Sequence, residues 1–164
     1  MNDNYAVING KKIELTEKQI KALGFEARKN PFERVANGNV YYRVTEYGNI
    51  DEFIERSDLT DSNLYSNVNY FNDDSVAQQV ALHQLLYRKL LKYSYDNEFE
   101  DEEWNGTNMH AYIIYNFTRK NYDIRWTRNE KEPGTVYFKT PTMATAAFNE
   151  VVMPFMKEHP DFVW

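Results

Sequence analysis

The sequence has no cysteine, three histidines, six glycines and no long apolar run. Without cysteine, disulfides, thiolate metal sites and a cysteine nucleophile are all excluded. The histidines, His83, His110 and His159, show none of the short spacings that histidine metal sites use, so the sequence predicts no metal centre. The few glycines leave little from which to build a phosphate-binding loop, and no P-loop or dinucleotide-binding motif is present. We therefore expect neither a cofactor nor an enzymatic activity.

No apolar segment is long enough to predict a signal peptide or a membrane span, so we expect a cytoplasmic protein that does not enter a membrane. A chain of 164 residues fits one domain or two small packed halves. The 13 tyrosines and 10 phenylalanines are residues that favour half-buried strands. This composition predicts a sheet with one face against a helix and the other near solvent.

The first half of the chain indicates three strands and a helix: strands over 40–44, 50–55 and 68–71, and a helix from Asp74 to about Tyr95. Residues 50–55 could equally form a helical turn. The strand predictions rest on β-branched and aromatic residues, and Gly48 provides the turn between the first two strands. Asn72 or Asp73 is the predicted N-cap of the helix. Apolar residues two to four positions apart along that helix predict a broad buried face.

The second half repeats this order, with strands over 111–115, 122–128 and 136–138 and a helix that opens at Thr140-Pro141. We therefore predict an α+β fold of tandem degenerate β-β-β-α repeats, which form antiparallel sheet(s) covered by helices. An α+β domain can also show this order without duplication. Thr16 to Leu23 predicts a short preceding helix, with a Thr16–Gln19 capping box. The predicted parts are a helical appendage (1–37), a first unit (38–95), an acidic linker (96–109) and a second unit (110–164).

The charge distribution points to a protein partner. Residues 41–110 contain five Lys and Arg against fourteen Asp and Glu, the reverse of what a general nucleic-acid binder shows. Clustered carboxylates have the sign of a nucleic-acid backbone and can compete for a cationic groove on another protein. Phe99 and Trp104 are the predicted apolar anchors beside them. The acidic candidates are Asp96, Glu98, Glu100, Asp101, Glu102 and Glu103, together with Asp51, Glu52 and Glu55. The linker can equally be a solvated connection whose charges stay in water.

A second candidate surface is basic and consists of Arg119, Lys120, Arg125, Arg128 and Lys131. These cations fall on a predicted hairpin that also carries several tyrosines and Trp126. Basic and aromatic residues interleaved on a sheet can bind single-stranded nucleic acid by stacking. Edge strands also carry Lys and Arg to block aggregation, so the pattern has a structural alternative.

Two expectations concern the C-terminal segment. Pro154 should kink or end the last helix, because it lacks an N–H and its ring clashes with the preceding turn. The chain ends Phe162-Val163-Trp164, and we expect these residues to dock onto the core rather than extend toward a partner.

Several segments resemble small accessory proteins encoded by bacteriophages and prophages of Firmicutes. The resemblance lies in residues 13–24, in Asn30-Pro31-Phe32-Glu33-Arg34, in Tyr41-Tyr42 followed by Gly48, and in Asn69-Tyr70-Phe71 leading into a helix. It implies a phage protein that acts inside a bacterial host, and such proteins include anti-CRISPR inhibitors. It assigns no site residue. The expected function is therefore a non-enzymatic inhibitor that binds a type II RNA-guided nuclease, or its guide complex, and blocks DNA binding or cleavage. A nucleic-acid-binding module and an oligomeric adaptor remain as alternatives.

Overall fold

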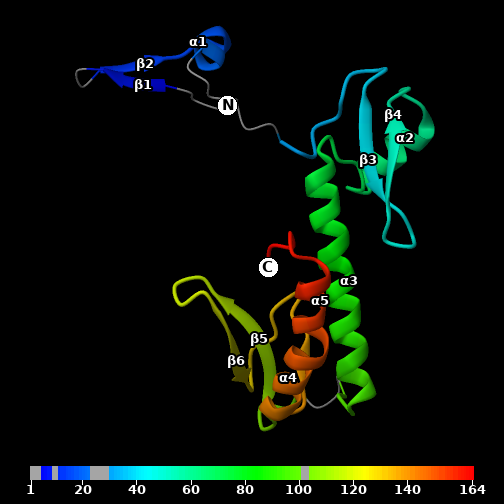
Figure 1. Cartoon of the computed structure of the whole chain (residues 1–164), viewed down its shortest axis with the longest axis vertical. Helices are drawn as coiled ribbons and strands as arrows, with labels where there is room; N and C mark the ends of the chain where they lie inside the picture. Colours follow the sequence, from blue (N-terminus) through cyan, green and yellow to red (C-terminus); the bar gives the residue numbers. More distant parts are fainter. Residues whose placement is uncertain (1–4, 9–10, 23–29, 101–103) are drawn as a thin grey trace.

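The computed structural model describes residues 5–8, 11–22, 30–100 and 104–164 and has an α+β fold (Figure 1). At the N-terminus, β1 (Tyr5–Ile8) and β2 (Lys11–Glu14) form an antiparallel hairpin, followed by α1 (Glu17–Ala22). The hairpin was not predicted, because its two strands are only four residues long and lack a clear apolar alternation. The Thr16–Gln19 capping box is confirmed, since the Thr16 N–H donates to Gln19 Oε1 (2.9 Å) and the Gln19 N–H to Thr16 Oγ1 (3.4 Å). The predicted end of this helix, Leu23, lies outside the described residues.

The first unit contains a second antiparallel hairpin, β3 (Val40–Val44) and β4 (Ile50–Ile54), as the sequence predicted. Its turn has Gly48 at φ 84°, a conformation that favours glycine. A short helix, α2 (Leu59–Ser66), follows and was not predicted. Its start is fixed by a capping box between Asp58 and Asp61.

The predicted strand over 68–71 is wrong except at its last residue. Only Phe71 pairs with β3, through a single bridge to Tyr42. Val68 has φ 57°, which is incompatible with an extended strand. The side chain of Asn69 replaces the missing strand pairing, because its amide donates to the Val44 carbonyl and accepts from the Val44 N–H, both at 2.8 Å.

The second unit contains a three-stranded antiparallel sheet in the order β6-β5-β7. Its strands are β5 (His110–Asn116), β6 (Asn121–Thr127) and β7 (Tyr137–Phe138), close to the predicted ranges. A continuous helical run follows, comprising α4 (Pro141–Ala147), the π-helical segment η2 (Phe148–Val152) and α5 (Met153–Glu158).

The two ends of this helical run test two predictions. Thr140 is confirmed as the N-cap, with the Met143 N–H donating to its hydroxyl at 3.2 Å. Pro154 was predicted to kink or end the helix, and an end at Pro154 is wrong, because the run continues to Glu158. The wide turn of η2 directly precedes Pro154, and a local switch of hydrogen-bond pattern is how a helix accommodates a missing N–H.

The long helix α3 (Asp74–Asp96) packs against both units (Figure 1). Its N-cap is Asp73, as predicted, and the Asp73 carboxylate accepts from the Ser75 and Val76 N–H groups. The first half of α3 buries Ala77 and Ala81 against Val44 and Phe71. The second half buries Leu82, Leu86 and Leu90 in a larger core made of β5, β7 and the C-terminal helices. One helix therefore supplies a side of two separate cores.

The C-terminal tail docks onto the molecule, as expected. Phe162 is buried in the second core, and the Trp164 ring packs against Tyr122 of β6, with centroids 5.1 Å apart. The side chain of Gln79 holds the tail to α3, since its amide donates to the Asp161 carbonyl (2.8 Å) and accepts from the Val163 N–H (3.0 Å). The tail thus crosses α3 near the boundary between the two cores.

Candidate functional site

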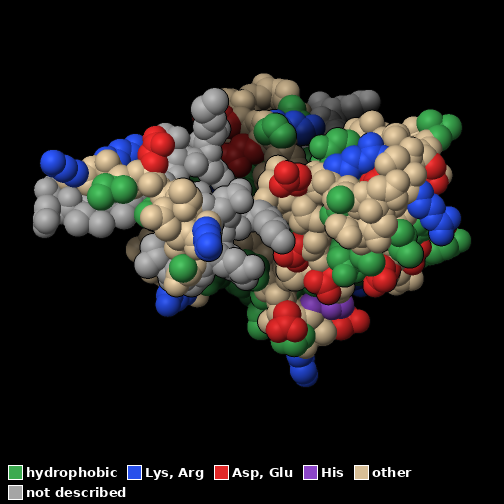
Figure 2. Space-filling model, turned by 90° about the horizontal axis from the view of Figure 1, so that it is seen from above, with side chains coloured by type: hydrophobic (Ala, Val, Ile, Leu, Met, Phe, Trp, Pro, Cys, Tyr) green, Lys and Arg blue, Asp and Glu red, His purple; other side chains and the backbone are tan. Residues whose placement is uncertain are grey.

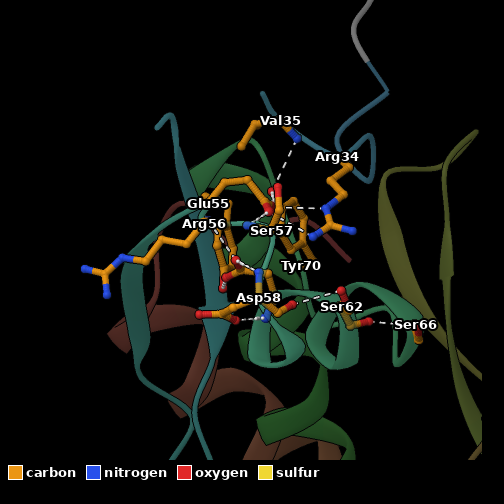
Figure 3. A network of polar contacts seen from close by, with 11 residues as sticks. Arg34, Val35, Glu55, Arg56, Ser57, Asp58, Ser62, Ser66 and Tyr70 are labelled. Atoms are coloured by element: carbon orange, nitrogen blue, oxygen red, sulfur yellow. Dashed lines mark hydrogen bonds and ion pairs between the residues drawn. The ribbon is translucent and has the colours of Figure 1, made fainter. Parts of the chain in front are cut away.

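A buried carboxylate network lies at the centre of the first unit (Figure 3). Glu55 follows β4 and its side chain is 0% exposed. Its Oε1 accepts from Arg34 Nη2 (2.8 Å) and the Ser57 N–H (2.7 Å), and its Oε2 accepts from Arg34 Nε (3.0 Å) and the Tyr70 hydroxyl (2.8 Å). Arg34 comes from the segment before β3, so this two-pronged ion pair holds that segment against the unit.

Asp61 of α2 forms the second half of the network. It accepts from the Tyr41 hydroxyl and the Arg56 N–H, both at 2.7 Å, and from the Asp58 N–H at 3.2 Å. The rings of Tyr41 and Tyr70 stack face to face with centroids 3.9 Å apart, which joins the two carboxylates through their donors. Both tyrosine side chains are buried.

The hydrogen bonds keep these buried groups in their ordinary charge states. The Arg34 guanidinium holds the pKa of Glu55 below its usual value, against the opposing effect of burial. Burial would raise the pKa of Asp61, but the donors from Arg56 and Tyr41 hold it below its usual value. Burial, followed by the bond to Glu55, raises the pKa of Tyr70 to about 12. The network is therefore an ionised structural centre, in which donors of this chain occupy the oxygens of both carboxylates.

The network corrects one part of the predicted acidic surface. Glu55 was placed on that surface and is fully buried, because its charge is matched by Arg34. Asp51 is partly exposed and paired with Arg43 at 3.2 Å. Of the three acidic candidates in this unit, only Glu52 is exposed and without an ion pair among the residues that the structure describes. Figure 2 shows acidic side chains interspersed with apolar and polar ones on the face seen from above, not a continuous acidic surface.

The acidic linker after α3 also differs from its prediction. Phe99 is buried, with its ring against those of Tyr95 and His110. The Trp104 ring stacks on the His110 ring with centroids 3.9 Å apart. Both predicted anchors therefore pack inside this chain rather than facing a partner.

The linker carboxylates are exposed where the structure describes them, namely at Asp96, Glu98 and Glu100. Asp96 forms an ion pair with Lys92, and Glu98 lies 3.8 Å from Lys139. The remaining candidates, Asp101, Glu102 and Glu103, lie outside the described residues. Ion pairs within the chain thus reduce the charge that two of the three exposed carboxylates offer to a partner.

The basic candidates are all exposed but do not form one cluster. Arg119 pairs with Asp123, and the Lys131 ammonium lies over the Trp104 ring, 5.7 Å from its centroid. Lys120 and Arg128 lie at opposite ends of β6, about 26 Å apart for an extended strand. Arg125, in mid-strand, points to the opposite face from Trp126, because neighbouring residues of a strand alternate. Aromatic rings lie beside cations on both faces, since Arg125 is directly opposite Tyr112 of β5 and the Arg128 guanidinium lies over the Trp126 ring, 5.8 Å from its centroid. The described cations therefore do not form one basic surface, and nucleic-acid binding stays a prediction.

The structure brings together an acidic groove that the sequence did not reveal. The groove has a volume of about 540 Å³ and lies between the β3–β4 hairpin, the start of α3 and the C-terminal tail. Its carboxylates are Glu52, Asp74 and Asp161, one from each of these three elements, and all three are exposed. None of the described residues that line it is Lys or Arg; the others are Tyr42, Ile50, Ser75, Gln78 and Gln79.

A second, apolar groove of about 670 Å³ lies further along α3. Its floor comes from Leu86 and Leu90 of α3, Ile113 of β5, Val136, and Phe138 of β7. Phe162 and Trp164 of the tail form one wall, and His83, Tyr87 and Arg88 stand on the α3 side. A mainly apolar hollow of this size is typical of sites that bind a small ligand or an apolar side chain of a partner.

The two grooves are neighbours. Gln79 lines the acidic groove and His83 lines the apolar one, and residues four apart lie on the same face of a helix. Asp161 and Phe162 are likewise consecutive residues of the tail, one in each groove. Together they form a paired groove along α3, acidic at its N-terminal end and apolar beyond, and we use the name paired groove for it below.

Sequence reasoning missed most of this site, because its lining comes from segments far apart in the chain. Glu52 was a candidate, whereas Asp74 was assigned only to the helix start and Asp161 to a docked tail. The polar face of α3, with Gln78 and Gln79 beside Asp74 and Ser75, was the one local signal available. No spacing rule connects these residues to the tail.

No protein-family model, no curated protein and no solved structure matches the chain. Within the part of the chain that the structure describes, no helix is long and apolar enough to cross a membrane. In the same residues, no three His, Asp or Glu side chains are grouped as a metal site requires.

Proposed function

We propose that this chain is a non-enzymatic binding protein whose paired groove receives a cationic segment of a partner protein. The observation that carries the proposal is the acidic half, which three exposed carboxylates line with no cation among the described lining residues. Such a site attracts Lys and Arg side chains and raises the rate of encounter with a positively charged surface. The apolar half supplies the pocket that a buried anchor residue of the partner needs.

The anchor is thereby expected on the partner and not on this chain. Phe99 and Trp104 are used internally, so this chain offers a hollow instead of a protruding side chain. A fitting partner segment presents basic residues next to a large apolar one. Arg88, at the side of the apolar half, can donate hydrogen bonds to a carbonyl or carboxylate of the same segment.

We propose a type II RNA-guided nuclease as the partner and inhibition of its DNA binding as the outcome. Nucleases of this class hold nucleic acid in cationic channels and read a short motif with Arg side chains. The support consists of the resemblance to phage accessory proteins and the charge of the groove. Binding there would exclude DNA by occupying the cations that DNA needs.

The test is target-DNA cleavage by purified type II nucleases with increasing amounts of this protein. We expect the triple variant Glu52→Gln, Asp74→Asn, Asp161→Asn to inhibit about tenfold less strongly, because electrostatic attraction is lost. The matched control is Glu130→Gln, Glu132→Gln, Glu158→Gln, which removes the same charge from exposed positions outside the groove. Asp74 lies in the first turn of α3, where its loss costs about 0.3–1 kcal/mol, so thermal unfolding must confirm that the variant is folded.

Two results would contradict the proposal. Equal inhibition by the groove variant and the parent would show that another surface binds the nuclease. A parent protein that inhibits none of the tested nucleases would remove that partner, and binding of a different cationic protein would then have to be sought.

We also propose that the two units arose as a tandem repeat. In the first unit β3 lies between β4 and the bridge residue Phe71, and in the second β5 lies between β6 and β7. A capped helix follows directly in both, at Asp73 and at Thr140. A relative whose two units are more alike in sequence would support duplication, whereas relatives whose units align with unrelated families would contradict it.

A further inference from the structure

The second sheet ends in a free edge. The order β6-β5-β7 leaves β6 with a neighbour on one side only, among the residues that the structure describes. β6 has seven residues, Asn121–Thr127, and every second residue directs its N–H and C=O groups away from β5. Such an edge is a template for pairing with another strand, and proteins normally protect it.

The protection expected at a free edge is weak here. Proteins block edges with proline, short strands or charged side chains, and β6 carries one charge of each sign, Asp123 and Arg125. β6 has no proline and is as long as any strand in the described residues. Trp126, near its end, is 55% exposed, which is unusual for the side chain most enriched in binding hot spots.

The residue order of β6 is complementary to itself. When two copies of β6 are paired antiparallel around Ile124, Asp123 of one copy lies opposite Arg125 of the other, and the reverse pair forms by symmetry. Tyr122 of each copy then lies opposite Trp126 of the other, and Asn121 opposite Thr127. Opposite charges and aromatic pairs across strands are stabilising, at about 0.2–1 kcal/mol for each pair.

The neighbouring registers lack this match. Residues directly opposite each other share a face of the sheet. The two-fold axis must therefore lie between one residue of β6 and the same residue of the other copy. An axis at Asp123 or at Arg125 places that charged side chain opposite the same side chain of the other copy, and like charges directly opposite are destabilising. The register around Ile124 also pairs all seven residues of the strand.

The side chains of Arg125 and Asp123 are available for this pairing. Arg125 is exposed and has no ion pair among the described residues. Asp123 is bonded by Arg119 and by the Asn116 amide within its own chain, and a carboxylate has capacity for a further donor. Asp123 and Arg125 lie on the face opposite to the helices, because their neighbour Tyr122 packs on Phe148. The charged pair therefore forms on the outer face, away from the helical layer.

We propose that this edge is the interface of a homodimer, in which two copies of β6 pair antiparallel around Ile124 to form one six-stranded sheet. A two-fold axis perpendicular to the sheet places the C-terminal helices of both copies on one face. A single strand pair is a small contact, and interfaces of such size give weak, reversible association. The interface shares no residue with the paired groove, whose lining contains no residue of β6.

The test is sedimentation velocity from about 1 μM to about 1 mM, a range that covers weak association. We expect the parent to pass from monomer to dimer. Arg125→Asp should weaken the dimer at least about tenfold, because two carboxylates then face each other on both sides of the axis. The double variant Asp123→Arg, Arg125→Asp exchanges the charges, restores both opposite-charge pairs and should recover the dimer. Lys89→Asp, at an exposed position of α3 away from β6, is the control and should dimerise like the parent.

A measurement without variants keeps the proposal testable if Asp123→Arg disturbs the hairpin. Hydrogen exchange of the parent should show amides of residues 121–127 gaining protection as the concentration rises. A parent that stays monomeric up to about 1 mM would overturn the proposal. So would a dimer that Arg125→Asp leaves intact, or a folded double variant that fails to recover.

Discussion

Replacing Glu55 by Gln tests whether the buried network stabilises the first unit. Glu55 is the sole acceptor for four donors in the network, two from Arg34 and one each from Tyr70 and the Ser57 N–H. A glutamine has one acceptor oxygen and one donor group in place of two acceptor oxygens. Two of the four donors therefore lose their partner or face another donor.

The size of the effect follows from the geometry. The least costly arrangement places the new amide nitrogen at the Oε2 position, where the Tyr70 hydroxyl can rotate and accept, while Arg34 Nε loses its partner. Removing one partner of a buried ion pair costs about 3–5 kcal/mol. The Arg34 side chain is 33% exposed and can regain water, so the lower end applies. We expect a loss of about 3 kcal/mol, or about 6–12 °C in Tm for a chain of this size.

Calorimetry and urea unfolding at neutral pH provide the measurement. The control is Glu46→Gln, which removes the same charge from an exposed turn residue and should stay within about 0.5 kcal/mol of the parent. A Glu55→Gln protein as stable as this control would refute the reasoning, because an unneeded carboxylate cannot be the centre of the network.

The pH dependence of the stability difference between the parent and Glu55→Gln is a second test of the network. The pKa of Glu55 is depressed in the folded state, so its contribution is complete above about pH 4.3, the value of a free Glu side chain, and is lost as the pH falls through the folded value. The stability difference between the parent and Glu55→Gln should therefore shrink below about pH 4. A difference that grows on acidification would contradict the ionised state assigned to Glu55.

Three further changes test other parts of the structure. Tyr41→Phe removes one donor to buried Asp61 and should destabilise the fold by about 1.5–3 kcal/mol in urea unfolding; an unchanged midpoint would mean that the other donors suffice. Thr140→Ala removes the N-cap of α4 and should cost about 1 kcal/mol, whereas Thr140→Ser should retain most of the stability, and equal losses in both would discount the cap. Gln79→Ala should free the C-terminal tail, seen as faster hydrogen exchange at Val163 and faster carboxypeptidase trimming, while Gln84→Ala should leave both rates unchanged.

Most regular elements were predictable, because local signals mark them. Asp73 and Thr140 identified the starts of α3 and α4, and β-branched and aromatic content identified β3 to β6. The helix α2 was missed because its eight residues have no apolar stripe. The pair Asp58 and Asp61 was the available signal, since an acidic residue at the cap and another three positions later form a capping box.

The candidate site was less predictable, because a residue's charge does not reveal its role. Eight Asp and Glu lie in residues 30–73, and their density suggested an acidic surface. Asp58 and Asp73 cap helices, Glu55 and Asp61 are buried acceptors, and Asp51 is paired. These structural roles can be distinguished only when the hydrogen-bond donors near each carboxylate are known, and many of those donors come from distant parts of the chain.

The shared position of α3 has a consequence for how the molecule can be divided. A cut after residue 96 would leave Leu82, Leu86 and Leu90 facing water, and a cut before residue 74 would remove the helix that covers Val44 and Phe71. We therefore expect neither half to fold on its own. Fragments prepared for binding studies should aggregate or stay unfolded, and any deletion map of activity has to retain residues 30–164 intact.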